Sequence, residues 1–193
     1  MKYVLGAIPL ILAACSTTGY MRDAQPTSPP GEDEAKVIIY RTASFGGAYN
    51  FAVYELVPED GKLLGFTETD RYFEVRCTPG HHIFAALGEG ESFVEAELEG
   101  GKTYFIRAYS KFGVVTPRPG FAPVGRESEH WREIEEVLPQ LRCRELDPSQ
   151  TVQVERRQQE RVRESLARFQ EGKTAPRPLD TDDGRPEKTL QAK

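Results

Sequence analysis

The chain has 193 residues and a formal net charge of −5, and its isoelectric point lies near 5.4. A chain of this length holds one domain of ordinary size with a single hydrophobic core. The acidic balance lacks the basic face of a nucleic-acid-binding protein, which argues against that class. It is also a poor match for anionic lipid head groups, so charge alone predicts no membrane contact.

The first residues have the order of an export signal. Lys2 supplies one positive charge, and residues 3–12 form an apolar run that is too short to span a bilayer, which needs about 20 residues. Residues 12–15 read Leu-Ala-Ala-Cys, a pattern that resembles the bacterial lipobox. The resemblance implies that the Cys15 thiol carries lipid (palmitate) and that residues 1–14 are removed as a signal peptide. The alternatives are an ordinary secretory signal or a short buried segment.

Residues 15–34 are interpreted as the lipidated cysteine followed by a flexible tether, because they are rich in Ser, Thr, Pro, Gly and acidic residues. In lipoproteins of the enterobacterial type, an Asp after the lipidated cysteine retains the protein on the inner membrane. Ser16 occupies that position here. The resemblance therefore implies a lipid anchor in the outer membrane, with the protein facing the periplasm.

Residues 35–146 alternate short apolar runs with turns, which predicts a mainly β domain. Residues 37–40 are a compact β-branched run, and residues 51–56 alternate with period two. The turn chemistry of residues 58–61 predicts a hairpin with the strand that follows. About six to eight such strands at spacings near ten residues predict an antiparallel β-sandwich, either Ig-like or transthyretin-like.

A short helix that packs on the sheet is predicted after the last of these strands. Ser128 is a suitable N-cap, and Trp131, Ile134 and Leu138 recur at helical spacing. Pro139 is expected to end the helix.

A second helix is predicted over residues 147–171, starting near Asp147. It is longer and polar, with only a thin apolar stripe, so we expect a solvated helix. Residues 172–193 contain three prolines and few apolar residues, so we expect a disordered tail.

Two cysteines remain besides Cys15. Export exposes the chain to an oxidising compartment, where an even number of remaining cysteines favours a disulfide. We therefore predict a Cys77–Cys143 bond. The alternative is two buried thiols that never meet.

Several segments between residues 36 and 124 together resemble a family of small bacterial lipoproteins that is defined by a domain of unknown function (the DUF 2846 type). The matching segments are residues 37–41, 64–65, 79–81 and 101–107. The resemblance implies an Ig-like or transthyretin-like sandwich and brings no catalytic residues.

Candidate metal ligands occur on two predicted strands. His81 and His82 are adjacent, so their side chains point to opposite faces, and we interpret one as core-facing and one as exposed. Glu95, Glu97 and Glu99 share one face, which we interpret as the solvent side of the strand. A divalent-cation site is the alternative for these carboxylates. We predict no metal ligand.

The sequence holds no Gly-x-Ser-x-Gly elbow or His-Glu-x-x-His motif. The Gly-rich stretch at residues 44–48 lacks the Lys-Ser/Thr ending of a phosphate-binding loop. Cys77 as a nucleophile would need a nearby base, for which His81 is close in sequence, but a disulfide is the preferred interpretation. We therefore expect a non-enzyme with no catalytic residue and no cofactor.

Four aromatic residues lie in or near Gly- and Pro-rich loops: Phe45, Tyr49, Phe112 and Phe121. Loop aromatics form a recognition surface or fold back as small satellite cores. We expect the second.

These features predict an envelope lipoprotein whose anchored β-domain has a structural or protein-interaction role. The expected partners are the membrane, through lipid on Cys15, and another envelope protein or peptidoglycan, with no nucleic acid. The alternative is a protein that binds a small ligand or metal, through the strand face at Glu95 or a pocket near the loops.

Overall fold

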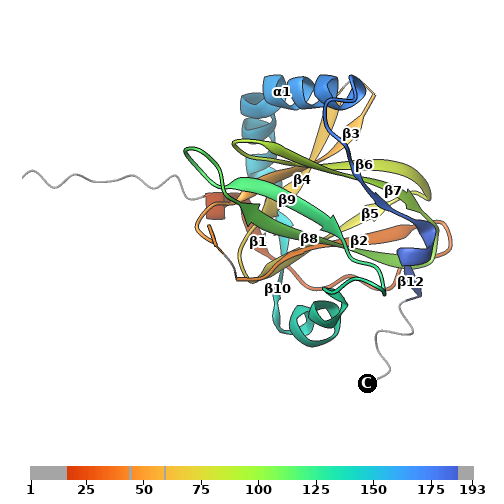
Figure 1. Ribbon diagram of the computed structural model, residues 1–193. Helices are drawn as coiled ribbons and strands as arrows, with labels where there is room; N and C mark the ends of the chain where they lie inside the picture. Colours follow the sequence, from red (N-terminus) through yellow and green to blue (C-terminus); the bar gives the residue numbers. More distant parts are fainter. Residues whose placement is uncertain (1–16, 44, 59, 187–193) are drawn as a thin grey trace, which may run out of the picture.

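A computed structural model describes residues 17–43, 45–58 and 60–186, without the side chains of residues 17, 18 and 151–158. These residues form a mainly β structure of two mixed sheets, with a long helix, α1, along one side (Figure 1). Cys15 and the rest of the predicted signal peptide lie outside the described residues, as do residues 187–193.

Within the described chain, the larger sheet has seven strands in the order β1-β10-β5-β2-β8-β12, and β9 also pairs with β8. They are β1 (Met21–Asp23), β2 (Ala35–Arg41), β5 (Arg71–Cys77), β8 (Lys102–Lys111), β9 (Arg118–Pro123), β10 (Arg142–Leu146) and β12 (Arg185–Pro186). The smaller sheet has the order β11-β7-β6-β3-β4. It contains β3 (Phe51–Val57), β4 (Asp60–Thr67), β6 (Gly80–Leu87), β7 (Glu91–Leu98) and β11 (Arg177–Leu179). Both sheets contribute to one buried core, which includes Ile39, Phe84 and Tyr104.

The prediction of antiparallel sheets is wrong for three strand pairs. β2 pairs with β8, β10 with β5 and β11 with β7, all in parallel. Every residue of β2 is buried, because one face lines the shared core and the other is covered by a short helical segment. A continuous apolar run such as Val37-Ile38-Ile39-Tyr40 is typical of a parallel strand that is buried on both faces.

The short helical segment lies in the region where a packed helix was predicted. It consists of a π-helical turn, η2 (Glu133–Val137), followed by a 3-10 turn, η3 (Leu138–Gln140). Ile134 is buried with Tyr40 and Phe105 on the outer face of the larger sheet. The apolar spacing of this segment therefore reflects a second, smaller core outside the sandwich.

Helix α1 (Pro148–Gln170) occupies the region predicted to be a polar helix. The Asp147 side chain caps it by accepting a hydrogen bond from the backbone N–H of Ser149, at 2.9 Å. Val162 packs so closely on β4 that a Cβ at Gly61 would lie 2.4 Å from Val162 Cγ1. The thin apolar stripe thus docks α1 on the smaller sheet. No described helix, including the polar α1, is both long and apolar enough to cross a bilayer.

The predicted flexible tether is wrong from residue 17 onward. A 3-10 turn, η1 (Thr17–Tyr20), leads into β1, which pairs with β10. Met21 is buried in the main core, and the Tyr20 ring stacks on Phe66 with 5.2 Å between centroids. The Ser-, Pro- and acid-rich composition hides these two apolar residues, whose burial fixes the segment to the sandwich.

The predicted disordered tail is also wrong as far as residue 186. After α1 the chain adds β11 beside β7, passes through the 3-10 turn η4 (Thr181–Asp183), and adds β12 beside β8. Leu179 is fully buried in the main core, and the Arg185 guanidinium lies over the Trp131 ring, 4.8 Å from its centroid. One buried leucine and two short strand pairings thus order a segment whose average composition had suggested disorder.

The predicted Cys77–Cys143 disulfide is not formed, and both thiols are free and buried. Cys143 pairs with Tyr72 on β5, whereas Cys77 lies at the end of that strand. The offset along β5 corresponds to roughly 16 Å at the usual rise per strand residue. A disulfide needs Cα atoms less than about 7 Å apart, so the geometry keeps the two cysteines separate.

Candidate functional site

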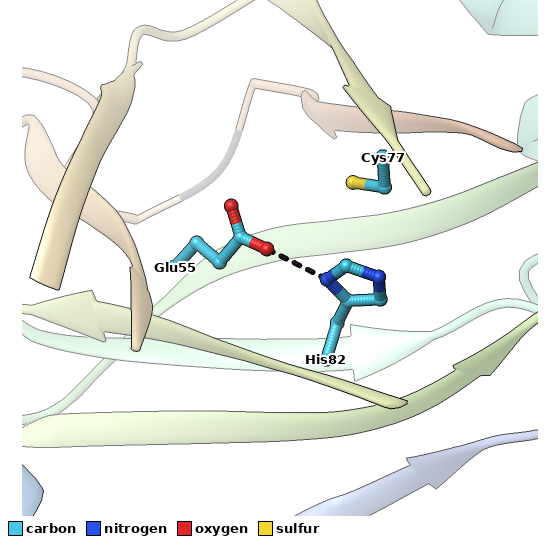
Figure 2. A group of neighbouring side chains, drawn as sticks. All are labelled: Glu55, Cys77 and His82. Atoms are coloured by element: carbon cyan, nitrogen blue, oxygen red, sulfur yellow. Dashed lines mark hydrogen bonds and ion pairs between the residues drawn. The ribbon is translucent and has the colours of Figure 1, made fainter. Parts of the chain in front are cut away.

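Three chemically reactive side chains meet where the chain passes from the larger sheet to the smaller one. Cys77 ends β5, His82 lies near the start of β6, and Glu55 comes from β3, the neighbour of β6 (Figure 2). Gly80, between Cys77 and His82, has a φ of 120°, a conformation that glycine adopts without strain. This tight corner brings Cys77 and His82 close together although they belong to different sheets.

The ring of His82 is held at both nitrogens. Nδ1 lies 2.6 Å from Glu55 Oε1, and Nε2 lies 2.8 Å from the carbonyl oxygen of Thr78. A carbonyl oxygen and an ionised carboxylate only accept hydrogen bonds, so both ring nitrogens must donate. His82 is therefore positively charged in this arrangement and forms an ion pair with Glu55.

The two pKa shifts agree with this assignment. The hydrogen bond that His82 donates to Glu55 raises the pKa of His82 above its ordinary value, against the opposing effect of burial. The hydrogen bond from His82 lowers the pKa of Glu55. Each group favours the charged form of the other, as expected for a half-buried pair.

Cys77 completes the cluster as a protonated thiol. Burial, with a smaller effect from the Glu55 charge, raises the pKa of Cys77 to about 12. A thiol of this kind is a poor nucleophile near neutral pH. His81, the base that lies close in sequence, pairs instead with Glu95. His82, which does lie near the thiol, has no free ring nitrogen with which to take its proton. The cluster therefore lacks the activated thiolate of a cysteine enzyme.

The same three residues have the donor set of a zinc site. Their sulfur, nitrogen and oxygen ligand atoms all lie within 4.8 Å of one another, and within the described part of the chain no other such group of three occurs. Tetrahedral zinc places its ligand atoms about 3.5 Å apart, so binding would require the side chains to shift. It would also require Cys77 and His82 to release protons.

The other candidate ligands from the sequence do not join this cluster. The interpretation of the two histidines is confirmed, because His82 points inward whereas His81 is exposed and pairs with Glu95 at 2.8 Å. Glu99 pairs with Lys102, also at 2.8 Å. Glu95 and Glu99 therefore take part in separate surface ion pairs rather than converging on one point.

The loop aromatics divide into two groups. Phe121 is fully buried in the main core. Phe45 and Phe112 contact each other, with 4.5 Å between ring centroids, but both rings are largely exposed. The expectation of satellite cores is therefore wrong for Phe121, which belongs to the main core, and for Phe45 and Phe112, which form an apolar surface between two loops. Tyr49 is 46% exposed.

Comparison with known proteins gives one relative and no function. No family model matches the chain. The sequence is 29% identical over 126 residues to a protein of Haemophilus influenzae that is described as uncharacterized. The match covers 62% of this chain and 73% of that protein. The predicted likeness to the lipoprotein family with a domain of unknown function stays a prediction.

Proposed function

We propose that the protein is a lipid-anchored envelope protein, held on the outer membrane by lipid on Cys15 and facing the periplasm, with a structural or protein-interaction role. The observation that carries this proposal is the Leu-Ala-Ala-Cys pattern of residues 12–15, which follows a basic residue and a short apolar run. The cluster at Cys77 supports a non-enzymatic role of this kind. The pKa of the Cys77 thiol is strongly raised, and both ring nitrogens of His82 already donate hydrogen bonds to acceptors.

The fold changes how such an anchor would act. Only Ser16 separates Cys15 from Thr17, where the 3-10 turn leading into the sandwich begins. A lipid on Cys15 would therefore hold the domain against the bilayer surface, instead of letting it stand away on a long tether. Its partner, another envelope protein or peptidoglycan, would be met close to the membrane.

Metabolic labelling with palmitate in a bacterial host tests the anchor. The wild-type chain should incorporate label and fractionate with the outer membrane, and Cys15→Ala should do neither. Cys77→Ala and Cys143→Ala are matched controls, because they also remove one cysteine each but leave the lipidation site intact. Label that persists in Cys15→Ala would refute the anchor. Crosslinking in intact cells then addresses the interaction role, and reproducible absence of a crosslinked partner would contradict it.

A second candidate function, metal binding, is favoured by the Glu55–Cys77–His82 cluster. The chemistry of thiolate, imidazole and carboxylate suits zinc, and three protein ligands would leave one position open. Zinc titration of the purified protein, followed by thiolate absorbance and proton release, should saturate at one equivalent in wild type and fail in Cys77→Ser. Cys143→Ser is the control, since Cys143 lies outside the cluster. Equal responses of both variants would remove this candidate.

We also propose that the two mixed sheets are a variant of the Ig-like or transthyretin-like sandwich. Two sheets around one core support this class. The feature to compare with both classes is the parallel pairing of β2 with β8. An experimental structure, superposed on both classes, tests it. A strand order that matches neither class would contradict the proposal.

A further inference from the structure

One end of the molecule exposes apolar side chains on two adjoining loops. Phe45 in the β2–β3 loop is 54% exposed, and Phe112, Val114 and Val115 in the β8–β9 loop are 83%, 84% and 85% exposed. The contact between the Phe45 and Phe112 rings joins the two loops. We call these four residues the apolar tip. Exposed apolar groups of this kind, concentrated in one place, mark an interaction surface.

Glu89, in the turn between β6 and β7, holds the β8–β9 loop of the tip in place through hydrogen bonds. Its carboxylate accepts hydrogen bonds from the backbone N–H groups of Val114, Val115 and Thr116, at 2.9, 3.0 and 2.5 Å. These bonds lower the pKa of Glu89 to about 2. These three backbone donors are thus satisfied within the protein, so they do not depend on water for a partner when the loop enters the interfacial layer.

Two basic residues flank the tip at its base. Lys111 ends β8 and Arg118 begins β9, and the two are paired across the hairpin. The Arg118 guanidinium lies 3.4 Å from Glu89, whose charge is shared with the backbone donors. Apolar side chains that project beyond a pair of basic residues match the layering of a phospholipid surface, in which anionic head groups lie above the acyl chains.

The position of the chain start identifies the occupant of this surface. In Figure 1 the described chain begins at the left of the view, and the β8–β9 loop projects toward the same side. Because only Ser16 separates Thr17 from Cys15, a lipid on Cys15 would bring this side of the sandwich to the bilayer. Attachment at so short a distance gives the tip a high effective concentration of membrane, so even weak intrinsic affinity suffices.

We propose that the apolar tip inserts into the interfacial layer of the bilayer that carries the Cys15 lipid, as a second contact that fixes the orientation of the domain. This inference rests on the proposed lipid anchor. Val114 and Val115 enter the acyl boundary, Phe45 and Phe112 lie at the head-group level, and Lys111 and Arg118 contact the anionic head groups.

A fluorescent label that senses its surroundings tests the insertion. The lipidated full-length Val114→Cys variant, labelled with a nitrobenzoxadiazole dye, is reconstituted into vesicles of phosphatidylethanolamine and phosphatidylglycerol. The emission should shift to shorter wavelength, gain intensity and be quenched by spin-labelled lipid. Background labelling is low because lipid occupies the Cys15 thiol and the other two cysteines are buried.

Val57→Cys is the matched control. Val57 is also an exposed valine, 42% accessible, and it is the last residue of β3. The first residue of β3, Phe51, lies close to the loop that carries Glu89, so Val57 is at the far end of the strand from the tip. Its label should report water with or without vesicles. An independent variant, Val114→Ser with Val115→Ser, should keep the melting temperature of wild type, since both side chains are exposed, and should make the lipidated domain more accessible to added protease.

The outcomes separate this inference from the anchor on which it rests. One outcome is that the protein carries palmitate but the dye at position 114 reports water as fully as the dye at position 57. This outcome overturns the insertion and leaves the anchor in place. Absence of palmitate from the wild-type chain overturns both. Because the vesicles contain only lipid, a tip that needs a protein partner would also leave the 114 label in water.

Discussion

The backbone N–H of Phe66 donates a hydrogen bond to the sulfur of Met21, across a distance of 3.3 Å. Phe66 lies on β4, at the edge of the smaller sheet, and Met21 begins β1, at the edge of the larger one. This contact closes one side of the sandwich with a residue that lies six positions after the proposed lipidation site, Cys15. Met21, near the start of the described residues, is therefore part of the core.

Replacing Met21 with Ala tests this role. Truncation of a buried methionine removes apolar contacts and leaves a cavity, so Met21→Ala should lower the free energy of unfolding by about 3 kcal/mol. Chemical denaturation followed by circular dichroism measures the change. Arg22→Ala is the control, because the Arg22–Glu145 ion pair is exposed on both sides and should contribute less than about 1 kcal/mol. Equal stability of Met21→Ala and wild type would restore the interpretation of a flexible tether.

A similar test applies to the other end of the chain. Leu179 is fully buried where β11 pairs with β7, opposite Ala96. Leu179→Ala should cost about 3 kcal/mol, whereas Lys173→Ala, at an exposed position in the same segment, should change stability by less than about 0.5 kcal/mol. Thermal melts of the two variants measure the difference. Identical melting curves would mean that the segment after α1 does not contribute to the core.

The sequence predicted those features of the fold that depend on residues close together along the chain. The start near Asp147 and the thin apolar stripe were enough to locate α1 closely. It could not predict which strands meet, because pairings such as Val37 with Tyr104 depend on the path of the whole chain. Average composition also failed at both ends, since Met21 and Leu179 are isolated apolar residues in polar segments and only their surroundings show that they are buried.

The candidate site shows the same limit. Strand alternation predicted that one of His81 and His82 would face inward, and the structure shows that it is His82. Its partner Glu55 belongs to a strand that lies beside β6 only in the folded sheet. The nearness of Cys77 depends on a corner between two sheets, and no local spacing reveals it. The predicted export, together with two cysteines besides Cys15, favoured a disulfide, and only the register of Cys143 against Tyr72 separates the two cysteines.

The two free thiols lead to a further prediction. Cys77 and Cys143 are buried, and burial raises the pKa of both. At pH 8 the native protein should react slowly with a thiol reagent, and both thiols should react at once in denaturant, without prior reduction. Counting labels by mass spectrometry checks this. Denatured protein that stays unlabelled until a reductant is added would show that the cysteines pair after all.

The ion pair between Glu55 and His82 should make stability depend on pH in a defined window. The pKa of His82 is raised from its ordinary 6.5, so its contribution is complete below that pH and is lost as pH rises through the raised value. The pKa of Glu55 is lowered from 4.5, so its contribution is complete above that pH and is lost as pH falls through the lowered value. The pair should therefore stabilise the fold most between about pH 4.5 and 6.5.

A double-mutant cycle with Glu55→Gln and His82→Gln isolates this pair. The coupling energy should be about 1 kcal/mol near pH 5.5, a value that allows for partial solvent screening, and should decrease toward zero at high pH. The matched comparison is the exposed pair of His81 and Glu95, whose coupling should be smaller throughout. A coupling between Glu55 and His82 that does not change with pH would mean that the histidine is neutral, with one ring nitrogen free for a metal ion.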